Sequence, residues 1–148
     1  MRFVVAYDGT PISQTALARA KALADGVDGS VVVVSVIPVG NRTYARERGW
    51  LGPNEEFDRD RVVDWLRETA GAIAPDASFA YRTVDRWATR GKIGRVLRTL
   101  ATTENVDALA VGSQNAGRVV TVLSSVTQSV AYGSYDLYLV RSVDPVFA

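Results

Sequence analysis

The 148-residue sequence contains no cysteine and no histidine. These absences exclude disulfides, thiol chemistry, metal sites built on imidazole or thiolate, and the catalytic triads that need histidine. Long hydrophobic runs are also lacking, since none approaches the roughly 20 residues of a membrane-spanning helix, and the amino terminus lacks the apolar stretch of a signal peptide. An excess of one charge is missing too, because 17 basic residues stand against 16 acidic ones. We therefore expect a cytoplasmic protein that binds neither nucleic acid nor membrane.

What remains is a globular composition, with 47% hydrophobic and 22% charged residues. A chain of this length usually forms one domain, and a compact domain of this size buries roughly 68–70% of its unfolded surface. We expect a single domain over residues 1–141, followed by a C-terminal tail over residues 142–148.

Short apolar runs alternate along the chain with stretches of helical periodicity. The runs predict five strands, at Phe3–Tyr7, Ser30–Ile37, Ala77–Val84, Val106–Val111 and Leu137–Val140. The stretches between them predict four helices: one that begins at Thr10-Pro11, one from its N-cap Asn54 to Ile73, one around residues 93–101, and one over residues 119–131. This alternation is typical of α/β proteins with a parallel, doubly wound sheet.

The segment Val39–Pro53 has no clear period and is expected to be a long loop with room for a short helix. It carries Tyr44 and Trp50 among three arginines, at positions 42, 46 and 48. An aromatic side chain there can cover a base, and an arginine can meet a phosphate, but we favour a solvated loop with one aromatic residue packed down. The second basic run, residues 82–90 with Trp87, is also expected to be a solvated face.

Two strand ends are candidate ligand sites, because open α/β sheets bind ligands where the winding direction reverses. These ends are Ala6–Thr10 and Val111–Ser113. Asp8 can accept a hydrogen bond from a base amine or a ribose hydroxyl, or it can simply turn the chain before the first helix. From the sequence alone both roles stay open.

A loop of small residues, Gly112–Arg118, precedes the hydroxyl cluster Ser124–Thr127. Glycine lets backbone N–H groups approach a phosphate, and a helix N-terminus attracts an anion. The alternative is a polar loop followed by an ordinary serine N-cap. Neither the Walker pattern GxxxxGK with Ser or Thr nor a GxGxxG after the first strand is present.

Three segments together resemble the universal stress protein family. They are RFVVAYDGTPISQTALARAKALA, TVDRWATRGKIGRVLRTLATTENVDALAVGS and SSVTQSVAYGSYDLYLVR, and the resemblance covers the chain except residues 41–53. It implies a doubly wound five-stranded parallel α/β sheet in order 3-2-1-4-5 with helices on both faces, the adenine nucleotide alpha hydrolase-like fold. It also implies a homodimer formed through the fifth strand, Tyr135 to Arg141.

Family members that bind ATP carry the pattern G-x2-G-x9-G followed by Ser or Thr. Here Gly112 matches the first glycine, Asn115 replaces the second with Gly117 two positions later, and Ser124 replaces the third, one residue early. By the same resemblance, the remaining site residues are Asp8 against the nucleoside, Ala6, Val36 and Val111 on the adenine side, and Ser125, Val126 and Thr127 on the phosphate side.

Two functions follow from this resemblance. In the first, the chain is a small cytoplasmic stress-response regulatory protein that is not an enzyme. It binds an adenine nucleotide (ATP, ADP or AMP, which Mg²⁺ can accompany) at the ends of the first and fourth strands. In the second, it is a homodimeric interaction module without nucleotide that binds an unidentified protein partner, because serine poorly replaces a glycine that holds positive φ.

Overall fold

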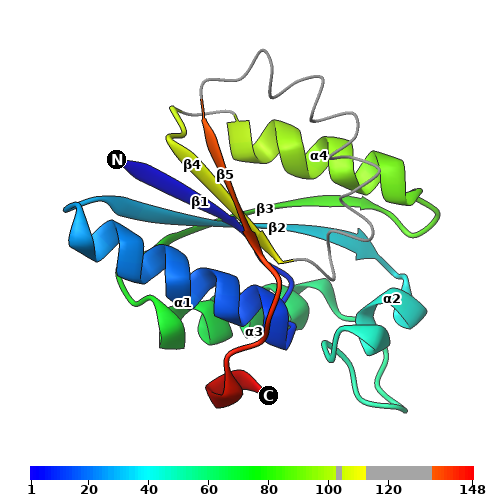
Figure 1. Ribbon diagram of the computed structural model, residues 1–148. Helices are drawn as coiled ribbons and strands as arrows, with labels where there is room; N and C mark the ends of the chain where they lie inside the picture. Colours follow the sequence, from blue (N-terminus) through cyan, green and yellow to red (C-terminus); the bar gives the residue numbers. More distant parts are fainter. Residues whose placement is uncertain (103–104, 113–134) are drawn as a thin grey trace.

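Five parallel strands form one sheet in the order β3-β2-β1-β4-β5 (Figure 1). The structure, a computed structural model, describes residues 1–102, 105–112 and 135–148. Its elements are β1 (Arg2–Ala6), α1 (Pro11–Gly26), β2 (Ser30–Val39), α2 (Arg42–Glu47), α3 (Arg59–Ile73), β3 (Ser78–Asp85), α4 (Arg90–Thr102), β4 (Ala108–Gly112), β5 (Asp136–Val140) and the one-turn 3-10 helix η1 (Pro145–Phe147). The predicted α/β class and the strand order 3-2-1-4-5 are confirmed.

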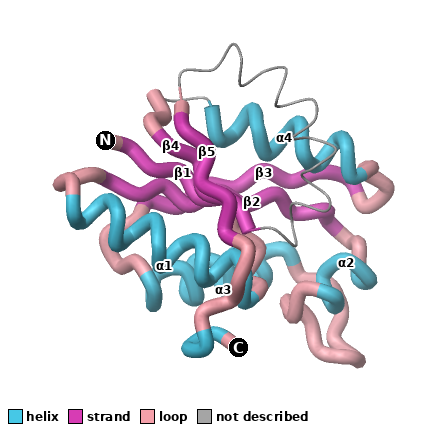
Figure 2. The backbone as a smooth tube through the Cα atoms, in the orientation of Figure 1, coloured by secondary structure: helices cyan, strands magenta, loops and turns pink. Residues whose placement is uncertain are grey.

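Helices cover both faces of this sheet (Figure 2). Successive side chains of β1 point to opposite faces, as the strand period of two requires. Phe3, Val5 and Tyr7 belong to the core under α1 and α3, whereas Val4 and Ala6 belong to a second core that α4 covers. This two-sided burial explains why the central strands are continuously apolar. The predicted helix over residues 119–131 lies outside the described residues.

The third helix begins later than the sequence suggested. Its N-cap is Asp58 rather than Asn54, and the Asp58 carboxylate accepts from the backbone N–H groups of Asp60 (3.0 Å) and Arg61 (3.3 Å). Asparagine and aspartate cap helices about equally well, so both residues satisfied the sequence rule. The predicted start at Asn54 was wrong.

The segment after β2 also differs from the prediction. β2 continues to Val39, and helix α2 follows after Asn41, whose side chain accepts from the Tyr44 N–H at 3.0 Å. Ala45, Trp50 and Leu51 are buried in the core under α1 and α3. What the sequence presented as a long loop is therefore a short helix with a packed extension.

The C-terminal tail folds back on α1. The backbone N–H of Asp144 donates to the Thr15 hydroxyl at 3.0 Å, and Asp144 in turn caps η1 by accepting from the Val146 N–H. Figure 1 shows the tail leaving β5 and running past α1 to the terminus. The tail therefore lies on a helix and not along the outer edge of β5.

Candidate functional site

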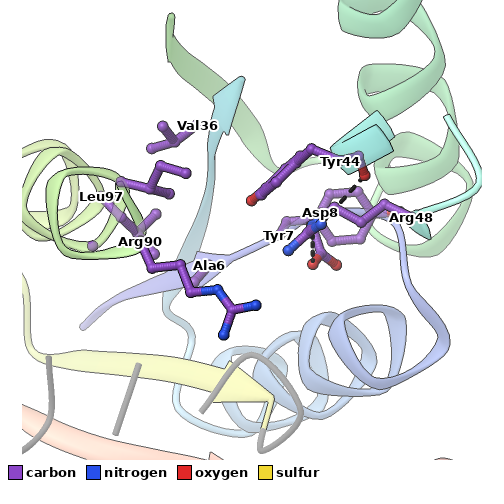
Figure 3. A pocket seen from close by; sticks show the side chains of 10 residues that line it. Ala6, Tyr7, Asp8, Val36, Tyr44, Arg48, Arg90 and Leu97 are labelled. Carbon is purple, nitrogen blue, oxygen red and sulfur yellow. Dashed lines mark hydrogen bonds and ion pairs between the residues drawn. The ribbon is translucent and has the colours of Figure 1, made fainter. Parts of the chain in front are cut away.

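A cleft opens at the carboxyl ends of β1 and β2, between α2 and the start of α4 (Figure 3). About 60 Å³ of it is open to the centre of a water molecule, and about 570 Å³ is free of protein atoms when the adjoining solvent space is counted. This is the edge of the sheet where doubly wound proteins bind ligands, because β1 is the strand from which the chain winds in both directions. Its lining residues are Ala6, Tyr7, Asp8, Val36, Tyr44, Arg48, Arg90, Ile93, Gly94 and Leu97.

Three of the predicted site residues line this cleft, namely Ala6, Asp8 and Val36. Val111 is buried in the core under α4. Gly112 packs against α1, where an added Cβ would approach the Ile12 side chain to 2.9 Å, so the close contact of helix and strand requires glycine here. The other predicted residues lie outside the described residues; they are Asn115, Gly117, Ser124, Ser125, Val126 and Thr127.

Asp8 turns the chain and lines the cleft at the same time. Its Oδ1 accepts from the Thr10 backbone N–H (3.0 Å) and from the Thr10 hydroxyl (2.5 Å). Its Oδ2 lies 3.5 Å from Nε of Arg48. The turn-forming role that the sequence left open is therefore present. The two bonds to Thr10 use only part of the Asp8 carboxylate, which has about four acceptor positions, so Asp8 can also accept from a ligand in the cleft.

The wall opposite α4 is built from α2 and the residues that follow it. Tyr44 and Arg48 are four residues apart, and the Arg48 guanidinium carbon lies 3.3 Å from the centre of the Tyr44 ring. The Trp50 ring packs against the Tyr44 ring at 5.5 Å, and its indole N–H donates to the backbone oxygen of Asp8 at 2.6 Å. This network ties the wall to the end of β1.

The prediction of a solvated loop with one aromatic residue packed down over residues 41–50 was right for Trp50 and wrong for Arg48, which is buried as well. Trp50 is only 6% exposed and Arg48 only 7%. A signal was available in the spacing of Tyr44 and Arg48, because residues four apart lie on one face of a helix. The sequence reasoning missed Tyr44 and Arg48 as joint lining residues because it treated the segment as irregular.

Tyr7 forms part of the floor and has a structural role. Its hydroxyl donates to the Thr69 hydroxyl at 2.7 Å, which joins the end of β1 to α3. Burial raises the pKa of Tyr7 above its ordinary value of 10.0. The phenol is therefore neutral at physiological pH and offers no charge to a ligand.

The charged residues of the cleft are Asp8, Arg48 and Arg90, so the lining has a net positive charge. Arg90 is the first residue of α4 and is exposed, and Figure 3 shows its side chain extending across the cleft. In residues 82–90 the predicted solvated face is observed, with Trp87 79% exposed.

Within residues 1–102, 105–112 and 135–148, no three or more acidic side chains are placed to hold a metal ion. None of the described helices combines the length and the apolar character that crossing a bilayer requires.

Fold and cleft together define a doubly wound α/β protein with a cleft at the edge of the sheet where proteins of this class bind ligands. The sequence model of the Universal stress protein family matches residues 1–134. The chain therefore belongs to the universal stress protein family. No curated protein sequence matches the chain significantly.

Solved structures of the same family share the fold. A universal stress protein crystallised in complex with cAMP has a TM-score of 0.52 and 17% sequence identity, over 95% of this chain and 96% of that one. The universal stress protein from Archaeoglobus fulgidus in complex with dAMP has a TM-score of 0.51 and 16% identity, over 95% of this chain and 97% of that one. At these identities the likeness concerns the fold.

Proposed function

We propose that this chain is a small cytoplasmic stress-response regulatory protein that binds an adenine nucleotide in the cleft and does not turn it over efficiently. The observation that carries the proposal is the composition of the cleft, in which apolar Ala6, Val36 and Leu97 face the charged Asp8 at the strand ends. A purine needs this combination, because its faces are apolar and its edge is polar. The cAMP and dAMP complexes of two family members support the same ligand class.

In the proposed complex the base lies against the apolar residues and its amino group donates to Asp8. Arg90 stands at the mouth of the cleft, where its charge would attract phosphates. The absence of histidine and cysteine from the chain removes the commonest general base and the thiol nucleophile, which favours binding without efficient hydrolysis. Any Mg²⁺ would arrive with the nucleotide.

Calorimetric titration with ATP, ADP and AMP tests the proposal, with GMP as the control for base preference. We expect saturable binding of at least one adenine nucleotide below 1 mM and weaker binding of GMP. If the three adenine nucleotides give no heat at millimolar concentration, the chain is not an adenine nucleotide receptor. The interaction module without nucleotide is then the better account.

A specific observation at β5 supports a second property, homodimerisation through that strand. Among the described strands β5 pairs only with β4, and its Tyr138 side chain is 39% exposed. An unpaired strand edge presents open N–H and C=O groups that a second copy can satisfy. The tail packs on α1, so among the described residues it does not occupy this edge.

Light scattering over a dilution series tests the dimer. We expect a dimer mass at tens of micromolar and a monomer mass for Leu139→Pro, because proline removes an N–H from the strand edge. Truncation after Arg141 is the control, and it should leave the dimer intact. A monomer mass for the full chain would contradict the proposal.

A further inference from the structure

Arg48 is a buried cation with incomplete hydrogen bonding. Its side chain is 5% exposed, and its Nη1 donates to the backbone oxygen of Tyr44 at 3.3 Å. Its Nε is buried and makes no hydrogen bond within the part of the chain that the structure describes, and Asp8 Oδ2 lies 3.5 Å away. The guanidinium thus stands beside the Asp8 carboxylate in the lining of the cleft (Figure 3).

A buried cation at this position is costly for the folded state. A buried donor without a partner costs about 1–3 kcal/mol, and more when it belongs to a charged group. Buried ion pairs are often no more stabilising than apolar residues of similar volume. Buried polar groups in native proteins are normally paired, and among the described residues Nε has the Asp8 carboxylate beside it without forming a hydrogen bond.

The surroundings hold Arg48 firmly in this costly position. Tyr44 supports the face of the guanidinium at 3.3 Å, and Asn41 caps the helix that carries Tyr44. The Trp50 indole fixes the end of the segment to Asp8 at 2.6 Å. A side chain locked by packing and hydrogen bonds around it is the arrangement that a precise binding site requires.

Arg48 and Asp8 together present a hydrogen-bond donor directly beside an acceptor. A carboxylate only accepts, and a guanidinium only donates. The ligand that satisfies both must carry a donor beside an acceptor on one edge. In adenine the amino group has a ring nitrogen on each side, N1 and N7, and each of these nitrogens is an acceptor.

We propose that Arg48 reads the base: Asp8 accepts from the adenine amino group while Arg48 donates to the ring nitrogen beside it. This inference rests on the proposed function, since it concerns the same cleft and the same ligand class. It makes the selection of the base depend on the pair of residues, because Asp8 alone would accept from any amino group.

The test uses AMP with two analogues, 1-deaza-AMP and 7-deaza-AMP, each of which replaces one ring nitrogen with C–H. Arg48→Met removes every donor and keeps an unbranched stem against Tyr44. Arg67→Met is the matched control, because the Arg67 guanidinium also lies over an aromatic ring, 5.3 Å from the centre of Phe79, but its side chain is 56% exposed on α3. Calorimetry gives the affinities, and circular dichroism confirms that each variant is folded.

In the unmodified chain we expect one of the two analogues to bind about tenfold or more weakly than AMP, as a lost hydrogen bond to a charged group implies. This penalty should vanish in Arg48→Met and persist in Arg67→Met. If Arg48→Met does not fold, Arg48→Lys is measured instead, and its penalty should fall because a point charge replaces the planar donor set.

Several outcomes would overturn the inference. One is an unmodified chain that binds AMP and both analogues equally well. Another is an analogue penalty that survives in the Arg48 variant, or an Arg48 variant that binds AMP as tightly as the unmodified chain or more tightly. Each leaves the proposed function standing. If the unmodified chain binds no AMP at all, the proposed function fails and the inference fails with it.

Discussion

Residues 41–50 and 82–90 contain nearly the same ingredients, a tryptophan among several arginines, yet the structure places them in opposite environments. Trp50 is 6% exposed and joins the main core, whereas Trp87 is 79% exposed. An arginine stacks on an aromatic ring in both segments, Arg48 on Tyr44 and Arg86 on Trp87. Composition alone therefore does not distinguish a wall of the cleft from a solvated turn.

The difference lies in the partners that the fold offers. Residues 41–50 follow β2, which has neighbours on both sides, and they meet the end of β1, where the Asp8 backbone oxygen accepts the indole N–H. Residues 82–90 lie at the end of β3, which is the edge of the sheet. A tryptophan is buried readily when its N–H finds an acceptor, and the backbone oxygen of Asp8, just after β1, is the acceptor for Trp50.

The largest expected difference between the two segments is in the free energy of unfolding when each tryptophan is removed. Trp50→Ala should lower the free energy of unfolding by about 3–5 kcal/mol, the range for large aromatic residues in a core, and the loss of the bond to Asp8 should loosen the cleft wall. Trp87→Ala should change it by less than about 0.5 kcal/mol, as exposed substitutions do. Urea unfolding measures both, and equal effects would contradict the environments assigned to the two residues.

Each segment also has an aspartate in contact with it or within it, Asp8 against residues 41–50 and Asp85 within residues 82–90. Asp8 and Asp85 each accept the N–H of the residue two positions on, and each lies beside a cation, Arg48 or Lys92. We expect Asp8→Ala to weaken AMP binding by about 1.5–3 kcal/mol, the range of hydrogen bonds to charged groups. Asp85→Ala should bind AMP like the unmodified chain. Unchanged affinity in a folded Asp8→Ala variant would remove Asp8 from the site.

The smallest expected effect is on AMP binding and compares two arginines of the second segment, Arg90 and Arg82. Arg90 lines the cleft and Arg82 does not, although both are exposed arginines. Arg90→Met should weaken AMP binding by about 0.2–1 kcal/mol, as exposed ion pairs do. The effect should shrink with added salt and be absent for adenosine, which has no phosphate. If Arg90→Met weakens the binding of adenosine and AMP equally, Arg90 lies against the nucleoside instead. The control variant, Arg82→Met, should change neither affinity.

The sequence predicted the fold well because the hydrophobic pattern of each strand reflects whether one or both of its faces are buried. β2 is continuously apolar since both its faces are covered, and β3 mixes polar and apolar residues since it is an edge strand. Helix starts were predicted less well, because Asn54 and Asp58 are both competent caps. In the structure the helix begins after Asp58, whose carboxylate accepts from two backbone N–H groups.

Part of the candidate site was also within reach of the sequence. Ala6 and Asp8 were found because strand ends and switch points follow from the order of the elements, whereas Val36 came from the family resemblance. Tyr44 and Arg48 were not recognised as a pair. Their place in the wall depends on a six-residue helix that local sequence barely specifies, because isolated helices shorter than about 12–15 residues are marginal in water.

Hydrophobic periodicity and chain order thus determined the strands, the helices and the parallel, doubly wound class, because burial of apolar surface leaves a local pattern in the sequence, and the family resemblance supplied the strand order 3-2-1-4-5. The tertiary structure alone decided which basic aromatic segment closes that cleft. The decision rests on one indole hydrogen bond to the Asp8 backbone and on a guanidinium held beside the Asp8 carboxylate. Such contacts join residues about 40 positions apart, and no local pattern encodes them.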